Sequence, residues 1–432
     1  MKADVSVIGL GKLGQCLAIS LIHKKFKVIG VDNNLKVINS LGNGKVTVDE
    51  PKVQKALKEN FKNIIFTEDI GFAVRNSNIT IIIVGTPSDT YGKFSNKYVK
   101  SCLKDISKTI VDKKQIHHIV ISSTVMPNSI DKIFIPYIEN NFNLKKHEHY
   151  SISYCPELVA LGSVFNDFLN PGMIIMGCSN EKASKKIRKI YNKWTDNSPE
   201  ILEMNILNAE ITKVAFNVYL TSKITFANNL YNIVNKLDGA NIDTITNSLG
   251  MDYRISRYFM KGGLSFGGTC FPRDIKAYEY LNKKYIKDTT YTDTIVKINN
   301  RQDKLLYNVV IKNVNKFSTI SILGLSFKPN TNVVDESPSI KLLASLIKLK
   351  NKINVFDSKA ISNTKIIFGN KINYFEKLDL AIKDANLIVL LNPIGNFKNI
   401  LNKTKRKIKL IDPWRLIDKS KLAKNIEYIH YK

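Results

Sequence analysis

Long apolar runs are missing from this chain of 432 residues. No stretch of eighteen uncharged apolar residues occurs, so a membrane-spanning helix is not expected. Directly after Met1 the chain enters an alternating apolar pattern, without the basic region and cleavage site of a secretion signal. We therefore expect a cytoplasmic protein with no membrane partner.

Cysteine is scarce, and the few cysteines are scattered. Their number is odd, no CxxC spacing occurs, and no pair of histidines lies near any of them. Neither a disulfide framework nor a metal site is expected from this pattern. The five are Cys16, Cys102, Cys155, Cys178 and Cys270.

Arginine is also rare, at eight of the sixty-five basic residues, which leaves fifty-seven lysines. The net charge of +28 would suit a nucleic-acid partner, but recognition of phosphates and bases usually depends on arginine. The lysines are spread along the whole chain, as on solvated helix faces. We expect no nucleic-acid partner, and a field that attracts small anionic substrates.

Short apolar runs alternate with amphipathic stretches, which is typical of a parallel α/β sheet. Six runs in the first half predict strands: "DVSVIGLG", "KVIGVD", "NITIIIVGTP", "HHIVISSTV", "YSISYCPEL" and "GMIIMGC". Five more follow near the C-terminus: "TISILGLSF", "KINVFD", "NLIVLLN", "KLID" and "IEYIH". The fold class predicted is α/β, with two Rossmann-like, doubly wound parallel-sheet domains joined by a long central helix.

The central helix is predicted from about Glu203 to Asp238, because no Gly or Pro interrupts the pattern before Gly239. We expect domains at 1–198, 199–314 and 315–432. Such a helix can also dimerise, and its apolar positions exceed what one flanking domain covers. The positions considered are Ile206, Leu207, Val214 and Leu220.

A glycine motif predicts a dinucleotide site. Gly9, Gly11 and Gly14 form G-x-G-x-x-G directly after a strand and at the start of a helix, and Asp32 ends the next strand. The glycines let a pyrophosphate approach the helix N-terminus. The Asp32 carboxylate can bind a ribose diol and would repel a 2′-phosphate, so NAD is favoured over NADP.

The stretch "GGLSFGGTCFPRD" surrounds Cys270 with glycines, which remove side chains that would block a second molecule. A packing thiol usually lies among aliphatic residues, so this one is a candidate for contact with a ligand. The alternative is a tight turn that carries an incidental cysteine.

Three further signals are weak by themselves. Lys213 and Asn217 are four residues apart on the central helix and share a face, but this helix is rich in both residue types. Glu157 and Thr124 follow strand ends, and strand carboxyl ends line the ligand crevice of such sheets.

Together these motifs resemble the nucleotide-sugar dehydrogenases, the family of UDP-glucose and GDP-mannose 6-dehydrogenases. The likeness runs nearly end to end and is specific in its order and spacing. It rests on "GLGKLG", "VGTP", "SSTV", "PELVALGSVFNDFLNPG", "AEITKVAFN", "GGLSFGGTCFPRD", "GLSFKPNTNVVDESPS" and "IDPWR". The resemblance implies an N-terminal NAD-binding domain, a helix that pairs two subunits, and a C-terminal domain that holds the nucleotide sugar.

The resemblance also implies a reaction. Family members oxidise a primary alcohol of a sugar to a carboxylate with two NAD, without releasing the aldehyde. Cys270 matches the nucleophile that forms a thiohemiacetal and then a thioester. Lys213 matches the residue that stabilises the oxyanion, and Asn217 matches its hydrogen-bonding partner.

Other residues are assigned by the same resemblance. Asp274 matches the carboxylate thought to act with Thr124 on water and protons, and Glu157 matches a general base for the alcohol step or the hydrolysis. The cofactor set is Gly9, Gly11, Gly14, Asp32, Thr86 and Thr124. The substrate set is Glu157, Lys213, Asn217, Arg254, which would reach the partner subunit's site, Gly267, and Lys328 from the C-terminal domain.

Three positions differ from the family's usual pattern, and one of them is "NPGM", which lacks the arginine often found in "NPDR". Leu161 stands where a second glutamate is usual, and Asp335 replaces the arginine of "RESP". UDP-glucose is the first expectation for the substrate, since "TCFPRD" resembles the UDP-glucose and GDP-mannose branches. The alternatives are GDP-mannose, a UDP-N-acetylhexosamine, or a nucleotide-sugar binding protein with weakened catalysis.

Overall fold

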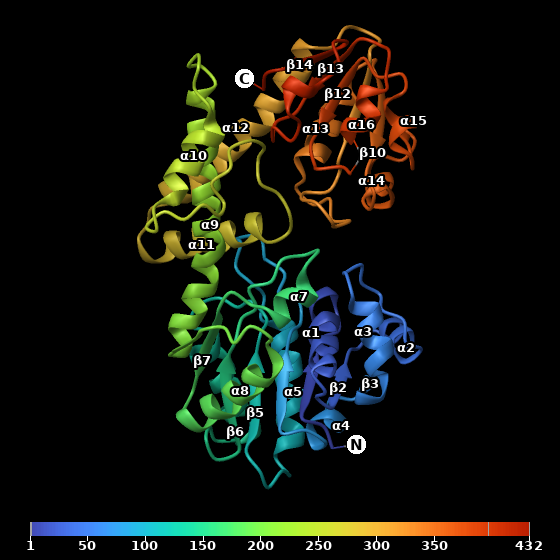
Figure 1. Ribbon diagram of the computed structural model, residues 1–432. Coiled ribbons are helices and arrows are strands. Elements are labelled where there is room, and N and C mark those ends of the chain that lie inside the picture. The colour runs from blue at the N-terminus through green and yellow to red at the C-terminus, as the bar shows by residue number, and fades with distance from the viewer. Residues whose placement is uncertain (1, 396, 432) are drawn as a thin grey trace. The chain divides into compact units, whose positions relative to one another are not determined.

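The structure is a computed structural model that describes residues 2–395 and 397–431. It consists of two compact units, Met1–Phe216 and Asn217–Lys432. In Figure 1 the first unit runs from blue to green and the second from green to red. Each unit contains one twisted sheet with helices on both faces, as the fold prediction required.

The sheet of the first unit has the strand order β3-β2-β1-β4-β5-β6-β7-β8. The first six strands are parallel, and β7 pairs antiparallel with β6. The strands are β1 Val5–Ile8, β2 Val28–Val31, β3 Ile64–Thr67, β4 Ile79–Ile82, β5 His117–Ile121, β6 Tyr150–Tyr154, β7 Ile174–Cys178 and β8 Ile201–Met204. The helices are α1 Lys12–His23, α2 Leu35–Gly42, α3 Val53–Asn60, α4 Ile70–Arg75, α5 Lys97–Ile110, α6 Ile135–Phe142, α7 Val164–Leu169 and α8 Glu181–Trp194.

The central strands are apolar on both sides because both faces of the sheet are covered. Val5 and Val7 of β1 belong to the core under α1, α3 and α7, whereas Ile8 belongs to the core under α4, α5 and α6. A strand covered on both faces has no exposed side, and all four residues of "VSVI", Ser6 included, are buried.

The sheet of the second unit has the order β11-β10-β9-β12-β13-β14, and all its pairs are parallel. Its strands are β9 Thr319–Leu323, β10 Lys352–Phe356, β11 Asn373–Tyr374, β12 Leu387–Leu390, β13 Ile408–Ile411 and β14 Ile426–Ile429. Helix α9, Ile206–Val234, begins in the first unit and continues into the second. The other helices of the second unit are α10 Ile242–Met251, α11 Phe271–Tyr285, α12 Thr290–Lys312, α13 Pro338–Leu346, α14 Ile361–Phe368, α15 Leu378–Ile382 and α16 Phe397–Asn402. The order reverses between β9 and β12, where ligands bind in open α/β sheets.

All eleven predicted strands are present, but β3, β8 and β11 were not predicted. The central helix α9 is shorter than expected at both ends, because Glu203 lies in β8 and the helix ends at Val234. Gly239 adopts a positive φ of 79° in the turn that follows. No helix in the described ranges is long and apolar enough to cross a membrane.

The prediction of which apolar side chains α9 leaves uncovered was partly wrong. Ile206 and Val214 are 5% and 0% exposed, so the chain itself already covers them. The exposed apolar side chains on the part of α9 in the second unit are Tyr219, Phe226 and Ile233, spaced by seven residues. A seven-residue repeat places side chains along one side of a helix.

Candidate active site

The turn between β1 and α1 has the geometry that a pyrophosphate needs. Gly9 has a φ of 97°, and a Cβ on Gly14 would lie 1.7 Å from the Gly9 carbonyl oxygen. Among the described residues, nothing lies within 4 Å of a Cβ built on Gly11, and Gly11, the N-cap residue of α1, has no side chain that could accept a hydrogen bond from the first amides of the helix. The first amides of α1 are therefore available to an anion.

Asp32 lies at the end of β2 as predicted. Its Oδ2 accepts a hydrogen bond from the Leu10 amide at 2.7 Å, and its Oδ1 accepts one from the Asn34 amide at 2.8 Å. These bonds hold the carboxylate beside the glycine turn. The glycines and Asp32 fit an NAD whose ribose hydroxyls bind this carboxylate.

Thr86 and Thr124 follow β4 and β5, and the structure brings them together. The Thr86 hydroxyl donates to the Thr124 carbonyl oxygen at 2.7 Å. Ser123 adds a bond from its hydroxyl to the Val84 carbonyl oxygen at 2.8 Å. The two loops are thus tied to each other at the carboxyl ends of adjacent strands.

Glu210 of α9 holds the same region and was missed in the sequence. Its carboxylate accepts the amide of Asn128 at 2.6 Å and that of Ile130 at 3.0 Å. Burial raises the pKa of Glu210 to about 7, although these amide hydrogen bonds favour the charged form. Glu210 lies one helical turn before Lys213, so it fastens the segment that follows Thr124 to the helix that carries the predicted lysine.

Glu157 and Lys213 are neighbours in the first unit. The Lys213 ammonium donates to the Glu157 carbonyl oxygen at 2.7 Å. Burial raises the pKa of Glu157 to about 8, against the opposing influence of the Lys213 charge and the Ser122 hydroxyl. Among the described residues, the buried Oε1 of Glu157 has no hydrogen-bond partner. A carboxyl group of this kind can exchange a proton near neutral pH.

Cys270 is exposed, whereas the other four cysteines are buried or partly buried. It is the N-cap residue of α11, with Pro272 in the first turn of that helix. The helix macrodipole therefore favours an anion at this position. The thiol is therefore accessible to a ligand. Its exposure agrees with the prediction that Cys270 is not a packing residue.

Asp274 lies one turn into α11 and is 0% exposed. Its Oδ2 accepts from the Asn217 side-chain amide at 2.6 Å, and its Oδ1 accepts from Arg273 at 3.0 Å. The structure thus joins Asn217 to Asp274, a pairing that the sequence did not indicate. Arg273, adjacent in sequence, was missed as the partner that compensates the buried charge.

The remaining predicted substrate residues lie in the second unit. Arg254 is exposed and forms two side-chain hydrogen bonds to Asp252, at 2.9 and 2.7 Å. The Lys328 ammonium lies 5.8 Å from the centre of the Phe327 ring. Gly267 is buried in the loop that leads to Cys270.

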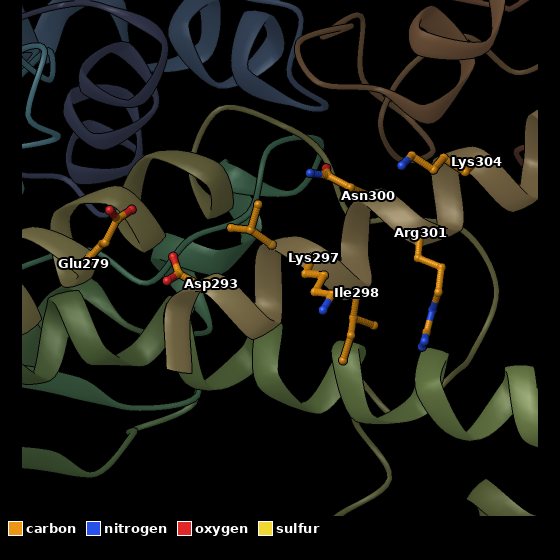
Figure 2. A pocket seen from close by; sticks show the side chains of 8 residues that line it. Glu279, Asp293, Lys297, Ile298, Asn300, Arg301 and Lys304 are labelled. Atoms are coloured by element: carbon orange, nitrogen blue, oxygen red, sulfur yellow. The ribbon is translucent and has the colours of Figure 1, made fainter. Parts of the chain in front are cut away.

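A cavity of about 630 Å³ lies beside α11 and α12. Figure 2 shows Lys297, Ile298 and Arg301 directed toward α9, with Asn300 and Lys304 on the other side of α12. Its lining carries both charges, and it contains none of the predicted site residues. In the part of the chain that the structure describes, no group of three or more His, Cys, Asp or Glu side chains could hold a metal ion.

Comparison with known proteins assigns all three segments of the chain to one family. Residues 3–195 match the NAD binding domain of the UDP-glucose/GDP-mannose dehydrogenase family, 207–301 its central domain, and 321–421 its UDP binding domain. The chain belongs to this family. It is therefore an enzyme of the nucleotide-sugar dehydrogenase type, and its cofactor is NAD.

Relatives of this dehydrogenase differ in substrate. The chain is 30% identical over 406 residues to a UDP-glucose 6-dehydrogenase of Rickettsia prowazekii, covering 92% of this chain and 91% of that one. It is 28% identical over 423 residues to a GDP-mannose 6-dehydrogenase of Pseudomonas syringae pv. tomato, covering 94% and 95%. The structure of a UDP-glucose dehydrogenase from Pyrobaculum islandicum aligns over 100% of this chain and 98% of that one, with a TM-score of 0.89. At 24% identity, that structure supports the fold alone.

Two of the unusual positions of this dehydrogenase have ordinary surroundings. Leu161 packs against the core of the first unit. Asp335 is exposed, and its backbone carbonyl oxygen accepts the Gly268 amide at 2.9 Å. The main chain at position 335 therefore supports the cysteine loop through its carbonyl oxygen.

Proposed function

We propose that this protein oxidises UDP-glucose to UDP-glucuronate at C6, in two successive two-electron steps. The observation that carries the proposal is an exposed Cys270 at the N-terminus of α11, one turn before a buried Asp274 held by Asn217 and Arg273. A packing cysteine would need neither the exposure nor the buried carboxylate beside it.

NAD, when bound at the β1–α1 turn, accepts the hydride of each oxidation. Cys270 adds to the aldehyde that the first oxidation produces, which gives a thiohemiacetal on the enzyme. The second oxidation converts this adduct to a thioester, and water releases the acid and the free thiol. The covalent bond keeps the aldehyde from leaving between the two steps.

The surrounding side chains take the roles that this sequence of steps requires. The ammonium of Lys213 stabilises the oxyanion, and Asn217 supports it. Asp274, with Thr124, assists the water that opens the thioester. Glu157 exchanges the proton of the alcohol or of the water, which its pKa of about 8 permits near neutral pH.

The choice of UDP-glucose is supported by the UDP binding domain match and by the 30% identical relative that acts on UDP-glucose. GDP-mannose is the second candidate, because a relative of comparable identity carries that name. The test is NADH absorbance after mixing the purified protein and NAD with UDP-glucose, GDP-mannose and UDP-N-acetylhexosamines separately. We expect the fastest NADH formation with UDP-glucose, and a faster reaction with another sugar would reassign the substrate.

A binding protein that has lost catalysis is the alternative from a different class. It was suggested by Leu161, which packs against the core of the first unit, and by Asp335, which is exposed. Nucleotide-sugar binding without NADH formation from any member of the panel would favour it.

We also propose a homodimer built on α9. Tyr219, Phe226 and Ile233 are 64%, 52% and 52% exposed and share one side of the helix. Apolar side chains aligned in this way usually meet a partner surface. The dimer would give Arg254 its expected role at the partner's site. We also propose that the chain divides into domains at 1–198, 199–314 and 315–432.

A further inference from the structure

The loop that leads to Cys270 is buried along most of its length. Residues 262–268 are buried, whereas Thr269 and Cys270 are exposed. The loop is therefore a packed support from which the thiol emerges. From the sequence, its glycines were interpreted as removing side chains that would block a second molecule, and the packing indicates another use.

The first glycine pair marks places of close approach. A Cβ on Gly262 would lie 2.6 Å from the Ala227 carbonyl oxygen of α9. A Cβ on Gly263 would lie 2.6 Å from the ring of Trp414, in the loop after β13. Neither position has room for a side chain, so the backbone here is fixed between a helix and the second sheet.

The second glycine pair is held in the same way by the loop after β9. A Cβ on Gly267 would lie 2.2 Å from the Glu336 carbonyl oxygen, and one on Gly268 would lie 2.6 Å from the Phe327 ring. Gly268 also has a positive φ of 84°, and its amide donates to the Asp335 carbonyl oxygen at 2.9 Å. Both glycine pairs thus contact loops at the carboxyl edge of the six-stranded sheet.

One charged side chain joins this edge to the start of the loop. The guanidinium of Arg415 donates to both carboxylate oxygens of Asp243, at 2.6 and 2.9 Å, and to the Gly262 carbonyl oxygen at 2.8 Å. It also donates to the Pro413 carbonyl oxygen at 2.6 Å and lies 5.0 Å from the centre of the Tyr231 ring. Four of its five N–H donors are used, so the group is held in one orientation.

The backbone of Arg415 has a φ of 54°, which is unusual for a residue other than glycine. Such a conformation persists where surrounding contacts require it, and it is common at functional sites. Asp243 lies in the first turn of α10, 172 residues earlier in the chain. Arg415 therefore connects α10, the glycine loop and the sheet through a single guanidinium.

We propose that Arg415 is a positioning residue for Cys270. By joining Asp243 and the Gly262 carbonyl to the loop after β13, it fixes the glycine loop on the carboxyl edge of the second sheet and so sets the position of the thiol. This inference rests on the proposed function, in which Cys270 is the nucleophile. Arg415 itself touches neither the thiol nor the reacting atoms in this account.

The test compares Arg415→Ala and Arg415→Lys with a matched control, Arg406→Ala. Arg406 lies in the same part of the chain, and its ion pair with Asp384, at 3.4 Å, is exposed. Hydrogen exchange of the peptide that covers 262–270 measures the fixation of the loop without any substrate. Steady-state kinetics with NAD and UDP-glucose measure the consequence for the reaction.

We expect the amides of 262–268 to exchange faster in Arg415→Ala than in the unmodified protein. The exchange rates of strands β9 and β12 should be unchanged. Its kcat should fall by about tenfold or more, because a small displacement of a reacting group is costly. Its KM for UDP-glucose should stay within about twofold, since substrate binding is not what changes. Arg415→Lys should recover part of kcat, and Arg406→Ala should behave as the unmodified protein.

Three results would overturn the proposal: unchanged exchange of 262–268, faster exchange with unchanged kcat, or a loss confined to KM. The last would make Arg415 a substrate-binding residue. If Arg415→Ala does not fold, Arg415→Lys and Asp243→Asn apply the same criteria. If the unmodified protein forms no NADH with any nucleotide sugar, the proposed function fails, and the exchange measurement still decides whether Arg415 fixes the loop.

Discussion

Glu157 should control how the reaction depends on pH. Burial raises its pKa from 4.5 to about 8, so at pH 7 only about one carboxyl in ten is ionised, whereas about half are ionised at pH 8. If the ionised form is the general base, kcat/KM for UDP-glucose should rise about fivefold between pH 7 and pH 8. An ordinary glutamate would give no rise in this interval, because it is fully ionised there.

The assay is initial NADH formation at low UDP-glucose, from pH 6 to pH 9.5 at constant ionic strength. Glu157→Gln removes the titration and keeps the shape of the side chain, and the exposed Glu59→Gln serves as the matched control. We expect Glu157→Gln to be much slower and to lose the rise between pH 7 and pH 8. Because Cys270 also loses a proton in the reaction, the role of Glu157 is measured by the difference between the pH profile of the unmodified protein and that of Glu157→Gln.

The same pKa makes an independent prediction for stability. A carboxyl whose folded-state pKa is raised stabilises the fold below its unfolded pKa of 4.5, and this contribution is lost as the pH rises through about 8. The thermal midpoint should therefore fall between pH 5 and pH 8, and less so in Glu157→Gln. Glu157 does not titrate in this way if Glu157→Gln keeps both the wild-type rise in kcat/KM and the wild-type decline in the thermal midpoint.

Three further predictions concern the cofactor, the oxyanion and the dimer. Asp32→Ala should weaken NAD binding and relax the preference against NADP, and equal use of both cofactors by the unmodified protein would contradict the assigned role. Lys213→Ala should lower kcat by roughly a hundredfold or more, as loss of a single oxyanion donor does, and a change in KM alone would contradict that role. Light scattering should find a dimer at micromolar concentration and a monomer for Phe226→Glu with NAD binding retained, whereas a monomeric unmodified protein would exclude the dimer.

The parts of the fold that could be predicted are those whose signal is local in the sequence. The run "VSVI", the glycines after it and Asp32 lie within one βαβ unit, so spacing and apolar pattern were sufficient. The start of α9 could not be predicted in the same way. The segment "ILEM" of β8 joins the helical pattern almost directly, and its pairing with β7 shows only in three dimensions.

The contacts of the site were largely beyond prediction because they join residues far apart in the chain. Asn217 meets Asp274 across 57 residues, and Arg415 meets Asp243 across 172. Contacts between residues so far apart in the chain produce no periodic pattern in the sequence. The glycines near Cys270 were visible in the sequence, but the reason why glycine is needed there was not. The carbonyls and rings that exclude a Cβ belong to other segments of the chain.

The amount of NADH formed per sugar distinguishes a four-electron oxidation through Cys270 from a single two-electron step. The protein is mixed with excess NAD and a limiting amount of UDP-glucose, and the product is separated after NADH formation stops. We predict two NADH and one UDP-glucuronate per UDP-glucose, no free aldehyde captured by added hydrazine, and no net turnover by Cys270→Ser, which should still bind NAD. One NADH per sugar with a released aldehyde, or a Cys270→Ser variant that still forms two, would exclude this mechanism.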